Sequence, residues 1–303
     1  MKHYGKNLIF VAVTILLLPY IVTTIFEGGV NFAKEETVQS SKSVLVNDNQ
    51  VQLELDVEQY IIGVLASQIS VTYEREAIKA QSVIARTSII KKIGSRKSIN
   101  TSELNLGYVN ILQMEEHWGY KDFYVNYELL QEIVAETKGE IIEYEGQPIE
   151  AAFHAVSASA TRSGEDALGS DKYPYLQSVS SQKDVESEEY FSVVSISFDK
   201  MSDLFQTEIT NMPIVLEGDE QGYVKRIKIN GEAMSGEQFR KTLSLPSACF
   251  EMKTENKGIT FSVTGKGHGL GLSLYGANEL AKQGKSYKEI LKYYYQNIDI
   301  VRE

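Results

Sequence analysis

The segment TGKGHGLGLS, residues 264–273, carries the most unusual local pattern in the sequence. Its glycines alternate with larger residues: Gly265, Gly267, Gly269 and Gly271. Alternating glycines allow a backbone to approach a bulky neighbour closely. His268 could there donate a hydrogen bond or transfer a proton, and the N-terminus of the helix that follows could accept an anion or polar sugar groups. The alternative is a tight strand-to-helix turn in which His268 only packs.

Two cations, Lys79 and Arg86, lie seven residues apart in an expected helix, so both can emerge on one face. Beside a cleft they could bind carboxylates. The alternative is that Lys79 forms a surface ion pair with Glu76, while the stem of Arg86 covers apolar surface.

His154 is followed by several hydroxyl residues, including Ser157. This grouping could indicate a hydrolase, but the sequence has no GxSxG nucleophile motif, and a polar loop explains it equally well. With four His and a single Cys, Cys249, the composition disfavours a zinc site and excludes an intramolecular disulfide. We therefore expect no metal and no cofactor.

Several elements must position these residues. Asp56 with Gln59 predicts a capped helix that ends at Gln68, and a longer helix is expected over residues 72–93, stopped by Gly94. Another helix over 127–138 and a hairpin over 140–156 precede a long polar loop, 157–190. The remaining patterns indicate helix, strand, helix, hairpin and two helices, the last with a capping box at Ser286 and Glu289. Helices and antiparallel hairpins without a βαβ rhythm predict the α+β class.

The composition is that of a globular protein: 303 residues, 43% hydrophobic and 23% charged. The net charge of −11 disfavours nucleic-acid binding, because such a chain does not attract a phosphate backbone by its overall field.

The N-terminus predicts a membrane anchor. Residues 8–26 are uncharged and long enough to span about 28 Å as a helix. Lys2 and Lys6 precede them, which places the N-terminus in the cytoplasm. A cleaved signal peptide is the alternative, although no convincing cleavage site follows. We expect a tip and anchor over 1–26, a polar linker over 27–45 and an extracytoplasmic domain over 46–303.

Three segments in the same order, residues 56–89, 146–179 and 265–295, resemble the stage II sporulation protein D (SpoIID)/LytB family. The resemblance extends over roughly residues 46–301. It implies an exported, membrane-anchored α+β protein of Gram-positive, mostly endospore-forming bacteria. The best-known members are lytic transglycosylases that cut peptidoglycan glycan strands after a partner amidase has removed the stem peptides. Related members are amidase enhancers.

The family's first helix ends in a segment like A-[AS]-E-M-P, whose Glu is the proposed acid and base. The corresponding residues here are Ala66-Ser67-Gln68-Ile69-Ser70. A lytic transglycosylase needs a carboxyl group to protonate the glycosidic oxygen and then to take the proton of the C6 hydroxyl. Gln68 can do neither, although its amide can donate a hydrogen bond. The resemblance therefore predicts weak or absent transglycosylase activity.

Other family positions are kept, and the resemblance implies that they bind glycan: Lys79, Arg86, His154, Ser157, Tyr175, His268, Ser273 and Tyr275. Both glycines of the family's F-H-S-x-S-G-G segment are replaced, at Ala158 or Ser159 and at Ala160. Some members bind zinc through His and Cys near this segment. The cysteines are missing here, which again predicts no zinc.

Three hypotheses follow. The first is a membrane-anchored protein that binds glycan strands in sporulation or cell-wall remodelling and assists an amidase. The second is an active lytic transglycosylase that uses Glu74 or Glu76 as its acid and base. The third is a structural module that binds a protein partner and leaves its groove unused.

Overall fold

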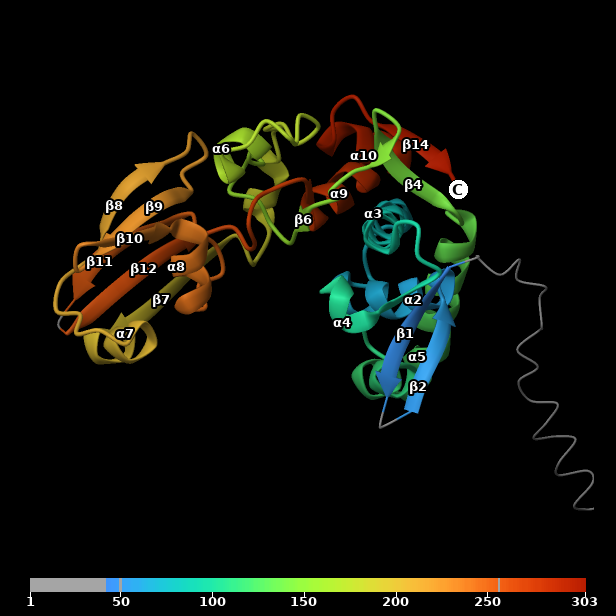
Figure 1. The fold of residues 1–303 in the computed structure, drawn as a ribbon, viewed down its shortest axis with the longest axis horizontal. Coiled ribbons are helices and arrows are strands. Elements are labelled where there is room, and N and C mark those ends of the chain that lie inside the picture. Colours follow the sequence, from blue (N-terminus) through green and yellow to red (C-terminus); the bar gives the residue numbers. More distant parts are fainter. Residues whose placement is uncertain (1–41, 49–50, 256) are drawn as a thin grey trace, which may run out of the picture. The chain divides into compact units, whose positions relative to one another are not determined.

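The computed structural model describes residues 42–48, 51–255 and 257–303 (Figure 1). The predicted anchor, residues 8–26, lies outside these ranges, as does most of the predicted linker. Among the described residues, no helix combines the length and the apolar character needed to cross a membrane. The first strand begins at Ser43, inside the predicted linker.

The first part of the fold is a helical core built around α3 (Arg75–Ile93). Its other N-terminal helices are α2 (Val57–Gln68), α4 (Thr101–Leu104) and α5 (Ile111–Glu136). A small sheet adjoins them, in which β1 (Ser43–Asp48) pairs antiparallel with β2 (Val51–Asp56) and parallel with β3 (Ser98–Asn100). Helix α3 packs against α2, α5, α9 and α10, so most of its side chains are buried.

The chain's C-terminal end returns to this core. Strand β4 (Glu140–Tyr144) pairs with β5 (Gln147–Pro148) and with β14 (Asp299–Arg302). Two short strands, β6 (Phe153–His154) and β13 (Leu272–Ser273), run parallel. Helices α9 (Leu274–Lys282) and α10 (Tyr287–Tyr294) follow β13. The polar loop contains two short helical turns, α6 (Gly164–Leu168) and the 3-10 helix η1 (Gln182–Glu186).

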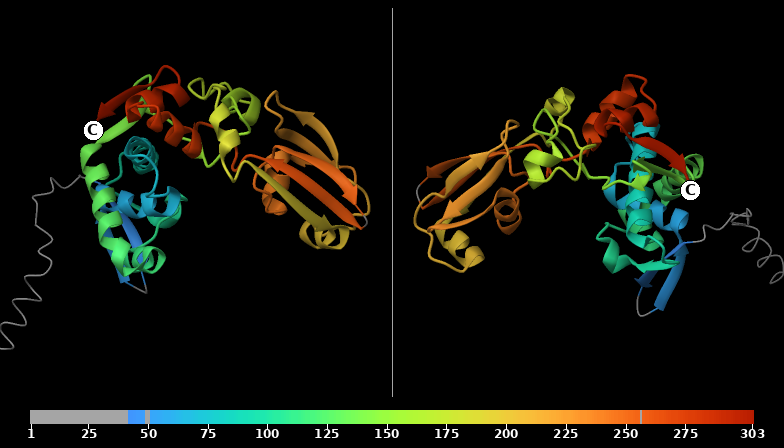
Figure 2. Two further views of the ribbon diagram at one scale, coloured as in Figure 1. Left: turned by 180° about the vertical axis from the view of Figure 1, so that it is seen from behind. Right: turned by 45° about the horizontal axis from the view of Figure 1, so that its top comes forward.

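Residues 191–264 form a second lobe with a hydrophobic cluster of its own (Figure 2). One sheet has the order β11 (Phe250–Glu255), β12 (Gly258–Thr264), β7 (Phe191–Ser197). The other has the order β10 (Glu232–Ser235), β9 (Val224–Ile229), β8 (Ile214–Gly218). Helices α7 (Phe198–Phe205) and α8 (Gly236–Thr242) complete the lobe, and Phe239 is fully buried at its centre.

The α+β class and most expected helices are confirmed, including the Asp56 cap, the stop at Gly94 and the Ser286–Glu289 capping box. Two expectations were wrong in detail. The helix expected over 127–138 begins at Ile111 and kinks at Gly119, where φ is 76°. The hairpin expected over 140–156 is short, because its second half leaves β4 and pairs with β13 instead.

Candidate functional site

A groove of about 540 Å³ opens at the C-terminal end of α2. One wall is the segment 66–72, which contains Gln68, and the other is part of α5. The α5 wall contributes His117, Trp118, Asp122 and Asn126. The groove is therefore polar with one large aromatic side chain, a combination suited to sugar rings and their hydroxyl groups.

Gln68 is held from inside the protein by Gln81 of α3. The amide Nε2 of Gln81 donates to Oε1 of Gln68 over 2.8 Å, and Gln81 is completely buried. In the described part of the chain, the amide nitrogen of Gln68 has no hydrogen-bond partner. Because its amide nitrogen is unpartnered there, Gln68 presents a hydrogen-bond donor, and it carries no proton that titrates near neutral pH.

The two carboxylates considered as substitutes are placed elsewhere. Glu76 accepts from Lys79 over 2.6 Å and from the backbone N–H of Tyr287 over 2.8 Å. Glu74 is exposed at the N-cap of α3, and its backbone N–H donates to Asn278. Neither residue lines the groove that contains Gln68.

The two cations expected to bind glycan are engaged in ion pairs. Arg86 is 1% exposed, and its guanidinium donates to Glu58 over 2.6 and 2.9 Å and to the carbonyl of Glu140 over 3.2 Å. Lys79 pairs with Glu76 and Glu136 at the edge of α3. Arg86 thus ties α2 to α3 and β4, and its side chain offers no exposed group to a ligand.

His154 and Ser157 form a buried hydrogen-bonded pair. The His154 Nδ1–H donates to the carbonyl of Leu270 over 3.1 Å, so Nε2 accepts from the Ser157 hydroxyl over 2.9 Å. Burial, together with the nearby ring of His268, lowers the pKa of His154 from 6.5 to about 3. The pair resembles a nucleophile and its base, but Ser157 is fully buried, which favours a structural role.

Asp184 connects the residues around His154 and Ser157 by hydrogen bonds, and no sequence motif had indicated it. Its carboxylate accepts from the hydroxyls of Ser273 over 2.7 Å and Ser181 over 2.9 Å and from the backbone N–H of Ser157. Burial raises the pKa of Asp184, while these hydrogen bonds oppose the rise. The expected site residues His154, Ser157 and Ser273 therefore meet in one buried network.

Three of the alternating glycines, Gly265, Gly267 and Gly271, lie directly against residues 152–158, whereas Gly269 lies against Tyr223 and Arg162. Gly271 has φ of 67°, and a Cβ there would lie 1.9 Å from the carbonyl oxygen of Ala152. A Cβ on Gly267 would lie 2.6 Å from Cβ of His154. His268, between them, is largely buried, and desolvation lowers its pKa to about 4.

The two tyrosines of the expected site differ in exposure. Tyr175 is 5% exposed, and its hydroxyl accepts from the backbone N–H of Glu150. Tyr275 is the second residue of α9 and is partly exposed. None of the eight expected glycan-binding residues lines the groove at Gln68, and their binding role stays a prediction.

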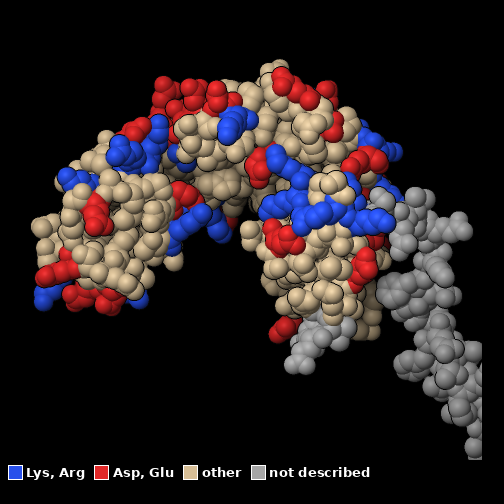
Figure 3. Space-filling view, viewed as in Figure 1, with Lys and Arg blue, Asp and Glu red and all other residues tan. Residues whose placement is uncertain are grey.

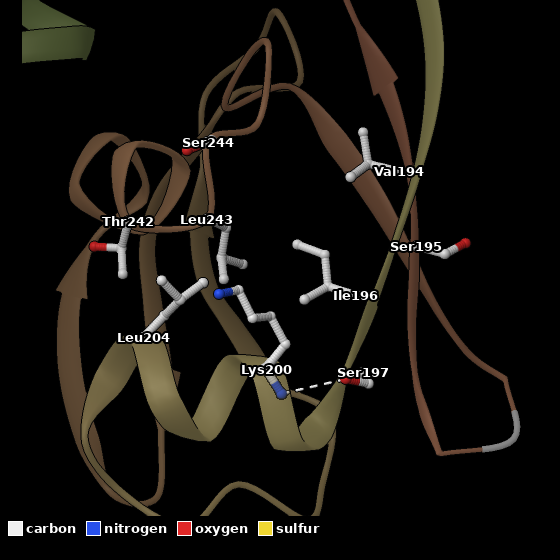
Figure 4. A pocket seen from close by; sticks show the side chains of 9 residues that line it. All are labelled: Val194, Ser195, Ile196, Ser197, Lys200, Leu204, Thr242, Leu243 and Ser244. Atoms are coloured by element: carbon white, nitrogen blue, oxygen red, sulfur yellow. Dashed lines mark hydrogen bonds between the residues drawn. The ribbon is translucent and has the colours of Figure 1, made fainter.

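The second lobe contains a larger groove of about 650 Å³ (Figure 4). Val194, Ile196 and Leu243 line it together with Lys200, the one charged residue among the described residues of its lining. Without a carboxyl group, this groove does not suit acid–base cleavage of a glycan.

Charges on the protein surface are mixed in sign. On the face shown in Figure 3, Lys and Arg side chains lie beside Asp and Glu. Across the described ranges, no cluster of three or more His, Cys, Asp or Glu residues is arranged to hold a metal ion.

The polar groove thus lies at the C-terminal end of α2, with the amide of Gln68 and the indole of Trp118 on its walls. The sequence model of the family described as Stage II sporulation protein matches residues 47–144. The chain is 31% identical to Stage II sporulation protein D of Bacillus subtilis (strain 168), over 99% of this chain and 96% of the relative. It is 34% identical to Stage II sporulation protein D of Bacillus amyloliquefaciens, over 81% and 74%. The chain belongs to the stage II sporulation protein D family.

A more distant relative is the Amidase enhancer of Bacillus subtilis (strain 168). It is 24% identical over 77% of this chain and 39% of the relative.

Proposed function

We propose that this protein binds peptidoglycan glycan strands during sporulation and assists a cell-wall amidase, with lytic transglycosylase activity weak or lost. Family membership supports the sporulation role, and the relative named Amidase enhancer supports the link to an amidase. The observation that carries the proposal is the groove in which Gln68, an amide, occupies the position of the expected acid.

The loss of activity follows from the chemistry of position 68. General acid–base catalysis contributes about 10²–10⁴-fold to a rate. Gln68 keeps a side chain of similar shape and donates a hydrogen bond instead of a proton. Such a side chain can hold a glycosidic or hydroxyl oxygen but cannot itself protonate it.

No contact supports the second hypothesis, in which Glu74 or Glu76 is the acid and base of an active lytic transglycosylase. Glu76 is bound by Lys79 and Tyr287, and Glu74 lies outside the groove. Moving a catalytic group by about 1 Å can lower a rate about 10²-fold, so neither position replaces a carboxyl at residue 68.

We also propose that residues 8–26 anchor the protein, with a cytoplasmic N-terminus and an extracytoplasmic domain. Support comes from the apolar run and its N-terminal lysines. Protease added to intact protoplasts should digest the C-terminal domain. Complete protection of that domain would contradict the topology.

The test of binding uses the full-length protein, purified in mild detergent and sedimented with peptide-stripped sacculi. Trp118→Ala should reduce sedimentation, because Trp118 lines the groove. Phe191→Ala, which removes an exposed aromatic from the second lobe, is the matched control. If the wild type neither sediments nor changes the rate of the amidase, the proposal fails and the structural-module hypothesis gains.

A further inference from the structure

The charged side chain that lines the groove at Gln68 is negative. Of the residues that the structure describes, Asp122 is the only one with a carboxyl group that lines the groove, and no Lys or Arg among them does. Asp122 is exposed and forms no salt bridge with any residue in the described ranges. A ligand in the groove therefore meets a negative charge that no Lys or Arg lining the groove compensates.

The neighbours of Asp122 are suited to a neutral sugar. Asn126 follows it by one helical turn on α5, so both oxygen-bearing side chains lie on one wall of the groove. Trp118, partly exposed, offers an indole surface to a pyranose ring, and Gln68 offers a donor from the opposite wall. Acceptors, a donor and an aromatic surface together match the hydroxyl, amide and ring surfaces of an N-acetylhexosamine.

The two sugars of a peptide-stripped glycan strand differ in charge. N-acetylglucosamine has a hydroxyl group at C3, whereas N-acetylmuramic acid has a lactyl ether that ends in a free carboxylate. A hydroxyl can donate to the carboxylate of Asp122. A lactyl carboxylate in the same place would be repelled by it, and no described Lys or Arg lines the groove to offset the repulsion.

We propose that Asp122 is a specificity-determining residue that selects a neutral N-acetylhexosamine, an N-acetylglucosamine unit, at this part of the groove and disfavours sugars with a free lactyl carboxylate. This selection rests on the proposed glycan binding. In a strand of alternating sugars, it would fix the register so that N-acetylglucosamine lies against Asp122. Two unit charges about 5 Å apart in water repel by enough to change affinity about fourfold at low salt. Salt screens this effect.

The experiment measures the affinities of the full-length protein and of Asp122→Asn at pH 8, by calorimetry, at about 10 mM and about 500 mM salt. The ligands are chitotetraose, which is neutral, and peptide-stripped glycan oligosaccharides, which carry lactyl carboxylates. Asp122→Asn should bind the stripped glycan at most about twofold more tightly at low salt, because the wild type disfavours one of two possible registers and the variant accepts both; the gain should be lost at high salt. Its affinity for chitotetraose should be unchanged or slightly lower. Asp203→Asn, which removes an exposed carboxylate in the second lobe, should change neither affinity.

Two kinds of result would contradict these expectations. Equal changes for both ligands, or a preference that does not depend on salt, would overturn the selection by charge while leaving glycan binding intact. A wild type that binds neither ligand would instead overturn the proposed function.

Discussion

Replacement of Arg86 by Met tests whether this arginine supports the groove or contacts glycan. Its side chain is 2% exposed and that of its partner Glu58 is 16% exposed. Arg86→Met would leave the Glu58 carboxylate without its cation inside the protein. Breaking a buried pair in this way destabilises a protein by about 3–5 kcal/mol. For a domain of this size, the melting temperature should fall by about 6–20 °C.

Circular dichroism during thermal and urea unfolding measures the effect. Lys79→Met is the matched control, because Lys79 is also cationic, lies on the same helix and forms partly exposed ion pairs. We expect the control to lose about 1 kcal/mol or less. At a temperature where Arg86→Met is still folded, its binding to glycan should equal that of the wild type. A variant of unchanged stability that no longer binds glycan would refute this reasoning and restore Arg86 as a ligand contact.

Three further predictions concern stability. Because the pKa values of His154 and His268 lie near 3 and 4 when folded, against 6.5 when unfolded, the unfolded chain binds protons first on acidification. The free energy of unfolding should therefore fall by about 2 kcal/mol per histidine between pH 7 and pH 5, and urea titrations of His154→Gln should show a smaller fall. Ser159→Gly should raise the free energy of unfolding by about 0.5–1 kcal/mol, because Ser159 has φ of 75°; an unchanged urea midpoint would contradict this. Gly271→Ala should lower it by about 3 kcal/mol or more, because its Cβ would meet the Ala152 carbonyl, and native-like thermal melting would argue against that packing.

Local signals in the sequence predicted the elements that carry them. The cap at Asp56, the stop at Gly94 and the glycine alternation each act within a few residues, and the structure contains all three features. The first half of α5 was missed because its apolar residues do not form a stripe: Ile111 and Leu112 are exposed, and Met114 is the buried residue before the kink at Gly119.

Contacts between distant segments were not predictable in the same way. Strands β6 and β13 have two residues each, too few for any periodic pattern. Asp184 lies in a polar loop and acquires its role only when Ser273 folds against it. The same limit applies to the groove, since Asp122 and Trp118 approach Gln68 only through the packing of α5 on α2.

The lost carboxyl group at position 68 is the central claim. The most direct measurement is chromatography of soluble products after peptide-stripped glycan strands are incubated with the wild type and with Gln68→Glu. In the variant, the Gln81 amide would donate to the new carboxylate and favour its charged form, so we expect partial activity. We predict anhydro-muramyl ends from Gln68→Glu and none above background from the wild type. Anhydro-muramyl ends from the wild type at a rate equal to that of the variant would contradict it.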